Sequence, residues 1–97
     1  MKEIAYSCPE YTIYYEYLDN VIFAHSDVHK WNKTIRNRYI KDCYSLFSNS
    51  EKPVLIAVNR NNIKLIKFGF LVGFVPFAEN MQIASGEIVD FYIWSEV

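Results

Sequence analysis

The order of sequence patterns along this 97-residue chain predicts an α/β (α+β) fold built on a mixed β-sheet. Residues 11–17 and 21–28 are rich in aromatic and β-branched side chains and flank a Leu-Asp-Asn turn, a pattern typical of an antiparallel hairpin. Residues 31–48 then repeat apolar side chains at steps of three and four, which indicates a long helix. Residues 54–58 form an apolar run of strand length, so we expect this helix to connect two parallel strands through a right-handed crossover.

The remaining elements are weaker in pattern. Residues 2–7 suit a short edge strand that ends before Pro9, because proline cannot donate to a strand ladder. After residues 54–58 an Asn-rich turn leads into a short amphipathic helix, which Gly69 is expected to end as its left-handed residue. Residues 71–77 are predicted as a strand, residues 78–86 as a loop and residues 87–94 as the final strand.

Asparagine side chains are the expected helix caps. Asn32 is the favoured N-cap of the long helix, with Ser26 and Asp27 as alternatives for a helix that begins earlier. Three residues can cap the short helix, and the sequence leaves the choice open between them: Asn59, Asn61 and Asn62.

The composition indicates one folded domain over residues 1–97. At 52% hydrophobic and 18% aromatic, the chain has enough apolar surface to exclude a disordered protein. No apolar run approaches the roughly 20 residues that span a bilayer. The acidic N-terminus has no apolar region of a signal peptide, so we expect a protein of the cytoplasm. Cys8 and Cys43 show neither metal-ligand spacing nor a disulfide framework.

Charge is distributed unevenly along the chain. Residues 30–67 hold nine of the ten Lys and Arg residues but only two of the eleven carboxylates. This segregation predicts a basic and an acidic face, or two solvated surfaces that differ in sign. A basic helix can follow nucleic-acid phosphates, but these charges wrap around its polar arc as on a solvated face, so a nucleic-acid partner is not expected.

Two segments resemble a known superfamily. Residues 54–70, a strand that leads through Asn into a helix and Gly-Phe, resemble the last βαβ unit of the GNAT (acyl-CoA N-acyltransferase) fold. Residues 25–31, His-Ser-Asp-Val-His-Lys-Trp, are similar to a segment of small GNAT-like proteins of tailed bacteriophages. The resemblance covers roughly residues 11–94. It implies a minimal GNAT-like domain, with an N-terminal hairpin and two C-terminal strands, in the host cytoplasm or the virion.

In that superfamily two parallel strands part and acetyl-CoA lies between them, with its diphosphate on a glycine-rich loop before the long helix. The matching residues 29–36 contain no glycine, which indicates a degenerate cofactor site. Lys30, Lys33 and Arg36 are the candidate phosphate contacts, and Asn59 matches an Asn that contacts the cofactor or caps the helix. Ile66 stands where many members carry a Tyr acid.

His25 and Asp27 are the candidate catalytic residues. Period-two alternation places them on one strand face, together with His29 if the strand runs that far. His25 could deprotonate an amine while Asp27 orients it. The same spacing suits a metal, but no third ligand is evident, so no metal site is expected. In the structural alternative, Asp27 caps the turn and His25 makes an ordinary hydrogen bond.

These observations favour a protein-binding role over catalysis. The aromatic hairpin offers Tyr14 and Tyr15 as interface residues, or as ordinary cross-strand pairs. Exposed sheet edges suit a partner strand or a second copy of the chain. We expect a phage-type GNAT-like protein that binds a virion or host protein, as a virion or ejection-associated component or a small inhibitor of a host system. The alternative is an acetyl-CoA-dependent N-acetyltransferase.

Overall fold

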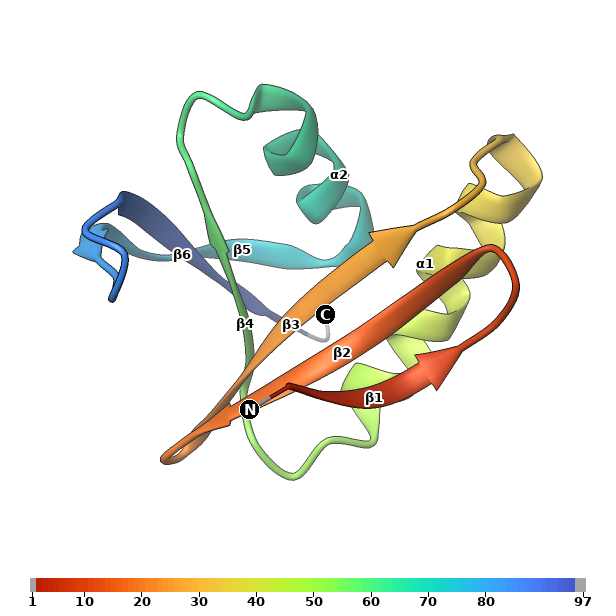
Figure 1. Ribbon diagram of the computed structural model, residues 1–97, viewed down its shortest axis with the longest axis horizontal. Coiled ribbons are helices and arrows are strands. Elements are labelled where there is room, and N and C mark those ends of the chain that lie inside the picture. Colours follow the sequence, from red (N-terminus) through yellow and green to blue (C-terminus); the bar gives the residue numbers. More distant parts are fainter. Residues whose placement is uncertain (1, 96–97) are drawn as a thin grey trace.

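The computed structural model describes residues 2–95, which form one mixed β-sheet and two helices (Figure 1). The elements follow one another as β1 (Lys2–Ser7), β2 (Tyr11–Leu18), β3 (Val21–Val28), α1 (Lys33–Ser48), β4 (Val54–Val58), α2 (Ile63–Val72), β5 (Phe74–Gln82) and β6 (Ile88–Trp94). The predicted fold class, with one long and one short helix, is confirmed. None of the helices in this described part is long and apolar enough to cross a membrane.

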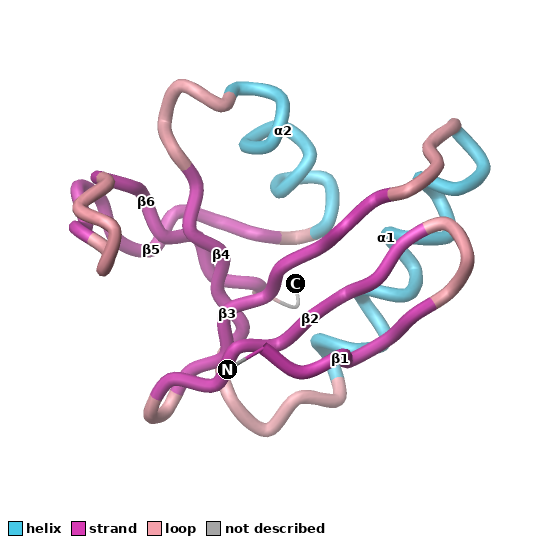
Figure 2. The backbone as a smooth tube through the Cα atoms, in the orientation of Figure 1, coloured by secondary structure: helices cyan, strands magenta, loops and turns pink. Residues whose placement is uncertain are grey.

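The sheet has six strands in the order β1-β2-β3-β4-β6-β5 (Figure 2). Neighbouring strands are antiparallel except β3 and β4, which are parallel and connected through α1. The predicted hairpin pairs residue by residue from Tyr11↔Val28 to Leu18↔Val21. The predicted crossover is therefore present, and it places the only parallel pair of the described residues in the middle of the sheet.

The parallel pair is short. Only Ile22↔Val54 and Phe23↔Leu55 face each other in register, and the two strands then diverge toward their C-terminal ends (Figure 1). Each strand keeps a full antiparallel partner on its other side, β2 for β3 and β6 for β4. The parting therefore leaves only the inner edges of β3 and β4 without sheet hydrogen bonds.

The core lies between α1 and one face of the sheet. Alternate residues of β2 point toward the helix, and α1 packs against them with side chains spaced four apart. The buried cluster consists of Tyr11, Ile13, Tyr15, Ile22, Ile35, Tyr39, Cys43, Phe47, Val54, Val72 and Phe74. Its aromatic rings meet mainly edge to face, such as Tyr11 on Tyr39 at 5.1 Å between centroids.

Several expected boundaries are wrong. The long helix begins at Lys33 rather than at residue 31, since Asn32 is its N-cap and accepts the Ile35 N–H at 2.8 Å. Gly69 does not end α2: it lies inside the helix, buried beside Ile56 of β4 and Phe74 of β5. The helix continues to Val72, and Gly73 is the left-handed residue, with φ of 117°.

The C-terminal hairpin also differs from expectation. The predicted strand at residues 71–77 begins only at Phe74, and the predicted loop at 78–86 is strand as far as Gln82. Pro76 is tolerated because β5 is an edge strand, and register shifts flank Ala78. Asn80 has a positive φ of 56° and donates its N–H to the Asp90 carboxylate at 3.1 Å. Such irregular pairing carries no clear period-two pattern in the sequence.

We predict that Gly73→Ala lowers the free energy of unfolding by about 3 kcal/mol, because the left-handed backbone is strained for alanine. The new Cβ would also lie 2.8 Å from Nε1 of Trp94, whose indole is held by its bond to the Val72 carbonyl. Gly86→Ala is the matched control. Gly86 also has a positive φ, of 88°, but open space around it, so only backbone strain of about 1–2 kcal/mol is expected. Equal losses for the two variants in urea unfolding would contradict the role of Trp94.

Candidate functional site

A cavity opens where β3 and β4 part, on the side of the sheet that the helices cover. Its volume is about 310 Å³, within the range of small-molecule sites. Small side chains leave this space: Ala24, Cys43, Ala57 and Gly69 all line it. Larger side chains form the walls that the helices contribute: Tyr39 and Phe47 of α1, and Leu65 and Phe68 of α2. We call this space the helix-side cavity.

Two polar groups that line the helix-side cavity, the Cys43 thiol and the Tyr39 hydroxyl, are protonated at neutral pH. Burial raises the pKa of the Cys43 thiol to about 12, so no thiolate nucleophile is available there. Burial also raises the pKa of Tyr39, whose hydroxyl shares a hydrogen bond of 2.5 Å with Ser26 of β3. The lining therefore combines the neutral hydroxyl and thiol groups of Ser26, Tyr39 and Cys43 with the ionisable side chains of Lys2, His25 and Asp27.

A second cavity of about 510 Å³ lies on the opposite, open face of the sheet, with Phe23 of β3 and Phe91 of β6 among its lining residues. We call it the open-face cavity. His25 and Ala57 line both cavities. Each lies two positions beyond the last parallel pair, Phe23↔Leu55, on its own strand. The two spaces therefore approach each other at the parting of β3 and β4.

His25 pairs with a carboxylate that the sequence reasoning missed. Its Nε2 lies 3.0 Å from Oε1 of Glu16, a residue of β2, and both side chains are about one third exposed. The strand register explains the contact: Tyr14 is directly opposite His25, and Glu16 is its diagonal neighbour on the same face. The hairpin register, applied to the sequence, would have identified Glu16.

The three predicted strand-face residues do not form one cluster. Asp27 lies on β3 and lines the helix-side cavity, whereas His29 follows the strand and donates its N–H to the Glu10 carbonyl at 2.8 Å. The partner of His25 is Glu16 rather than Asp27. Within residues 2–95 no three His, Cys, Asp or Glu side chains come close enough together to hold a metal ion.

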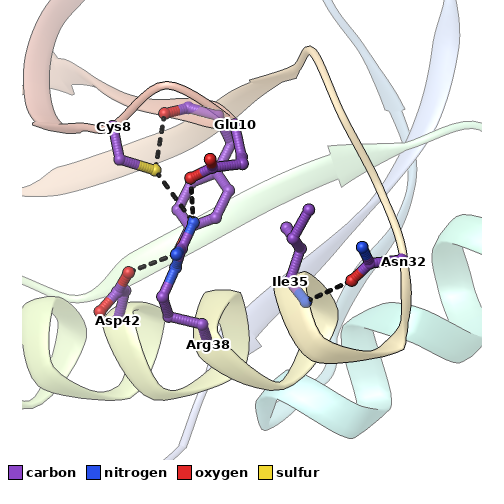
Figure 3. A network of polar contacts seen from close by, with 7 residues as sticks. Cys8, Glu10, Asn32, Ile35, Arg38 and Asp42 are labelled. Atoms are coloured by element: carbon purple, nitrogen blue, oxygen red, sulfur yellow. Dashed lines mark hydrogen bonds and ion pairs between the residues drawn. The ribbon is translucent and has the colours of Figure 1, made fainter.

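Half of the amides of residues 29–36 donate to a partner: those of His29, Lys30, Ile35 and Arg36. The Glu10 carbonyl accepts the N–H groups of His29 and Lys30, at 2.8 and 3.2 Å, and Asn32 accepts that of Ile35. Figure 3 shows Asn32 and Ile35 in this arrangement at the first turn of α1. The amides of His29 and Lys30 are therefore not available to a diphosphate.

A polar network holds the turn between β1 and β2 against α1 (Figure 3). Arg38 forms an ion pair with Glu10 and donates from Nε to the Tyr11 hydroxyl, and that hydroxyl donates to Asp42. The hydrogen bond from Arg38 lowers the pKa of Glu10. Because Glu10 also supplies the carbonyl for His29 and Lys30, the network indirectly positions the segment before α1.

Trp31 packs between the two helices. Its ring meets Tyr39 of α1 at 5.7 Å and Phe68 of α2 at 5.4 Å, both edge to face. Tyr39 and Phe68 also line the helix-side cavity, so Trp31 covers residues of its wall while remaining 45% exposed. We call these three rings the aromatic clasp.

The predicted cofactor contacts fall in two places. Lys30 and Lys33 are exposed near the start of α1. Arg36 is half-buried, and its Nε has no partner among the described residues. Asn59 follows β4; it accepts the Asn61 N–H at 2.9 Å and donates to Glu87 at 3.1 Å.

The cap of α2 is another asparagine. Asn62 accepts the Leu65 N–H at 3.2 Å, so Asn59 is a turn residue rather than the helix cap.

The two predicted interface tyrosines lie on opposite faces of the hairpin. Tyr14 is half-buried on the face that carries Glu16 and His25. Tyr15 belongs to the core, with 8% of its surface exposed and its ring stacked on Phe47 at 6.3 Å. Its hydroxyl has no hydrogen-bond partner within the described residues, and burial raises its pKa to about 12.

We predict that Tyr15→Phe raises the free energy of unfolding by about 1 kcal/mol, because it removes a buried hydroxyl that makes no hydrogen bond. Tyr11→Phe is the matched contrast. It breaks the bonds to Asp42 and Arg38 and is expected to lower the same quantity by about 1–2 kcal/mol. Urea unfolding at neutral pH measures both, and a destabilised Tyr15→Phe protein would show that its hydroxyl is satisfied after all.

Comparison with known proteins bears on the fold. No protein-family model matches the sequence, and no curated protein matches it. Solved structures do match: two chimeras of the spermidine N-acetyltransferase SpeG from Vibrio cholerae and hSSAT align with TM-scores of 0.62 and 0.61, each at 12% identity. Each alignment covers 88% of this chain but only 58% and 57% of the other chains. The chain thus spans less than two thirds of these acetyltransferases and has a GNAT-like fold.

Proposed function

We propose that this chain is a minimal acyl-CoA-dependent N-acyltransferase that works at the parting of β3 and β4. The observation that carries this proposal is the approach of two cavities, on opposite faces of the sheet, at His25 and Ala57. An acyl donor on the helix side and an amine on the open face would meet there. The GNAT-like fold of the chain supports this assignment, because the structural neighbours are named as acetyltransferases.

The helix-side cavity fits the pantetheine arm of an acyl-CoA. The arm is narrow and carries two amides, and about 310 Å³ is enough for a chain of that size. Beyond Phe23↔Leu55 the inner edges of β3 and β4 have no sheet partner, so their N–H and C=O groups can bond to such amides. The small residues Ala57 and Gly69 leave room for the backbone of the arm.

The diphosphate end would be held by side chains. Lys30, Lys33 and Arg36 place positive charge around the first turn of α1. The main chain contributes less than a glycine-rich loop does, because the amides of His29 and Lys30 already donate to Glu10. Affinity for the cofactor should therefore depend strongly on ionic strength.

His25 is proposed as the base that accepts the proton of the amine. If Nε2 carries the hydrogen and donates it to Glu16, the lone pair is on Nδ1, the nitrogen that can accept a proton. Glu16 then stabilises the imidazolium that forms, as a carboxylate beside a basic histidine does. When bound, the acyl-CoA supplies an activated thioester; the chain's own residues orient the amine and remove its proton.

Calorimetry with acetyl-CoA tests this proposal. We expect binding in the micromolar range that Lys33→Glu weakens at least tenfold, because the variant puts a negative charge beside the diphosphate. Lys41→Glu, an equal charge change on the exposed side of α1, should leave the affinity nearly unchanged. His25→Gln should keep the affinity and slow acetyl transfer about 100-fold or more. Absence of binding to the wild-type protein would refute the acyltransferase proposal.

A second candidate function is binding to another protein, as a phage-type virion or ejection-associated component or as an inhibitor of a host system. It is favoured by the hydrogen bonds of the His29 and Lys30 amides to Glu10 and by an apolar stripe on α2. Ile63, Phe70 and Leu71 of this helix are 54%, 50% and 60% exposed. We call them the α2 stripe. Such exposed apolar side chains on one helix are typical of an interface.

For this second function, Leu71→Asp should abolish capture of a phage or host partner without loss of folding, because it places a charge in the α2 stripe. Tyr14→Ala, on the far face of the sheet, is the matched control if α2 is the interface, and it should bind normally. The measurement is affinity capture followed by titration of the purified partner. Retained affinity in Leu71→Asp would exclude the stripe, and loss in Tyr14→Ala would move the interface to the hairpin.

A further inference from the structure

The open-face cavity has a lining that the proposed chemistry does not by itself explain. Apart from His25 and Ala57, its wall is formed by Leu18, Phe23, Phe91 and the loop residues Ile83, Ala84 and Ser85, with Glu16 as the one carboxylate. Most of these side chains are apolar. The open-face cavity is thus mainly apolar, with Glu16 as its single acidic side chain.

The aromatic pair gives the space a defined wall. Phe23 and Phe91 meet edge to face at 5.1 Å between centroids, and they come from β3 and β6 on either side of β4. A flat or branched apolar group can pack against such rings. Ring faces also attract a neighbouring ammonium group.

The loop between β5 and β6 forms the other wall and is held in place by its own hydrogen bonds. Ile83 donates its N–H to the Glu87 carbonyl at 3.0 Å, and the Ile83 carbonyl accepts the Gly86 N–H at 2.8 Å. The Ser85 hydroxyl accepts the Glu87 N–H at 3.4 Å. These bonds hold the loop in a defined conformation, so the wall does not depend on a ligand for its shape.

Glu16 is the group that can recognise charge. A carboxylate has two oxygens with about four acceptor positions, and His25 uses one of them. An ammonium group at the same edge would therefore bond to Glu16 and lie beside His25. Among the described residues, no Lys or Arg side chain lines the cavity to repel a cation.

We propose that the open-face cavity binds a compact primary amine with one positive charge and an apolar, aromatic or branched body. The single carboxylate selects one ammonium group, and the apolar wall selects against a polyamine, whose further charges would be desolvated without partners. The inference rests on the proposed function only in naming the amine as the acyl acceptor. Binding of the amine itself is independent of acyl-CoA.

The test adds 2-phenylethylamine as the probe to the full chain without cofactor. Backbone-amide NMR and calorimetry measure its binding. We expect saturable shifts at Phe23, Ala57 and Ala84, and weaker binding of 2-phenylethanol and of spermidine. Glu16→Gln should weaken binding of 2-phenylethylamine at least tenfold and leave the affinity for 2-phenylethanol unchanged. Glu87→Gln is the matched control, because Glu87 is a nearby carboxylate outside the lining and should not alter amine affinity.

A gain-of-function variant guards against a folding artefact in Glu16→Gln. Ala84→Glu adds a second carboxylate to the wall and should shift the preference toward spermidine at least tenfold. Equal binding of amine and alcohol, equal effects of the two glutamine variants, or tighter binding of spermidine by the wild type would overturn the inference. Amine binding without acetyl transfer would uphold it and count against the acyltransferase proposal alone.

Discussion

The parallel pairing of β3 and β4 is limited to two residues on each strand, and the arrangement of the molecule follows from that limit. Neither strand is left unsupported, because β2 and β6 pair with their outer edges over most of their length. The loss of sheet hydrogen bonds is confined to a few backbone groups that face the gap between β3 and β4. In return, one sheet acquires two cavities that approach each other beside His25, one of them walled in part by the loop between β5 and β6.

The helices determine how much space is open at the gap between β3 and β4. Small residues of α1 and α2, Cys43 and Gly69, keep the helix-side cavity open, whereas the aromatic clasp of Trp31, Tyr39 and Phe68 holds the helices together above it. The Arg38 network adds a second constraint by fixing Glu10 beneath the segment before α1. Recognition of a long ligand would therefore depend on side-chain charges at the helix start and on adjustment of Trp31.

The sequence predicts most of the fold because its elements are strongly patterned. The β2–β3 hairpin, α1 with Asn32 as its cap, and β4 all carry local signals that tertiary packing reinforces. The C-terminal third was less predictable. In α2 the apolar residues on both sides of Gly69 suit a helix and a strand, and the left-handed residue that ends the helix is Gly73 rather than Gly69.

The site was less predictable than the fold. His25 was identified from strand alternation, but its partner Glu16 lies nine residues away and becomes a neighbour only through the hairpin register. The cavities depend on where two strands separate, and no residue type encodes that point directly. The charges Lys30, Lys33 and Arg36 are visible in the sequence, whereas the use of the His29 and Lys30 amides by Glu10 depends on tertiary geometry.

The irregular borders of the sheet have a consequence for self-association. Strand β1 is interrupted by a bulge between Ile4 and Tyr6, and β5 carries Pro76 and two register shifts. A flat border would offer regular donors and acceptors on which further copies could stack into fibrils. Here a bulge interrupts one border and register shifts interrupt the other, which makes such regular stacking of copies less favourable.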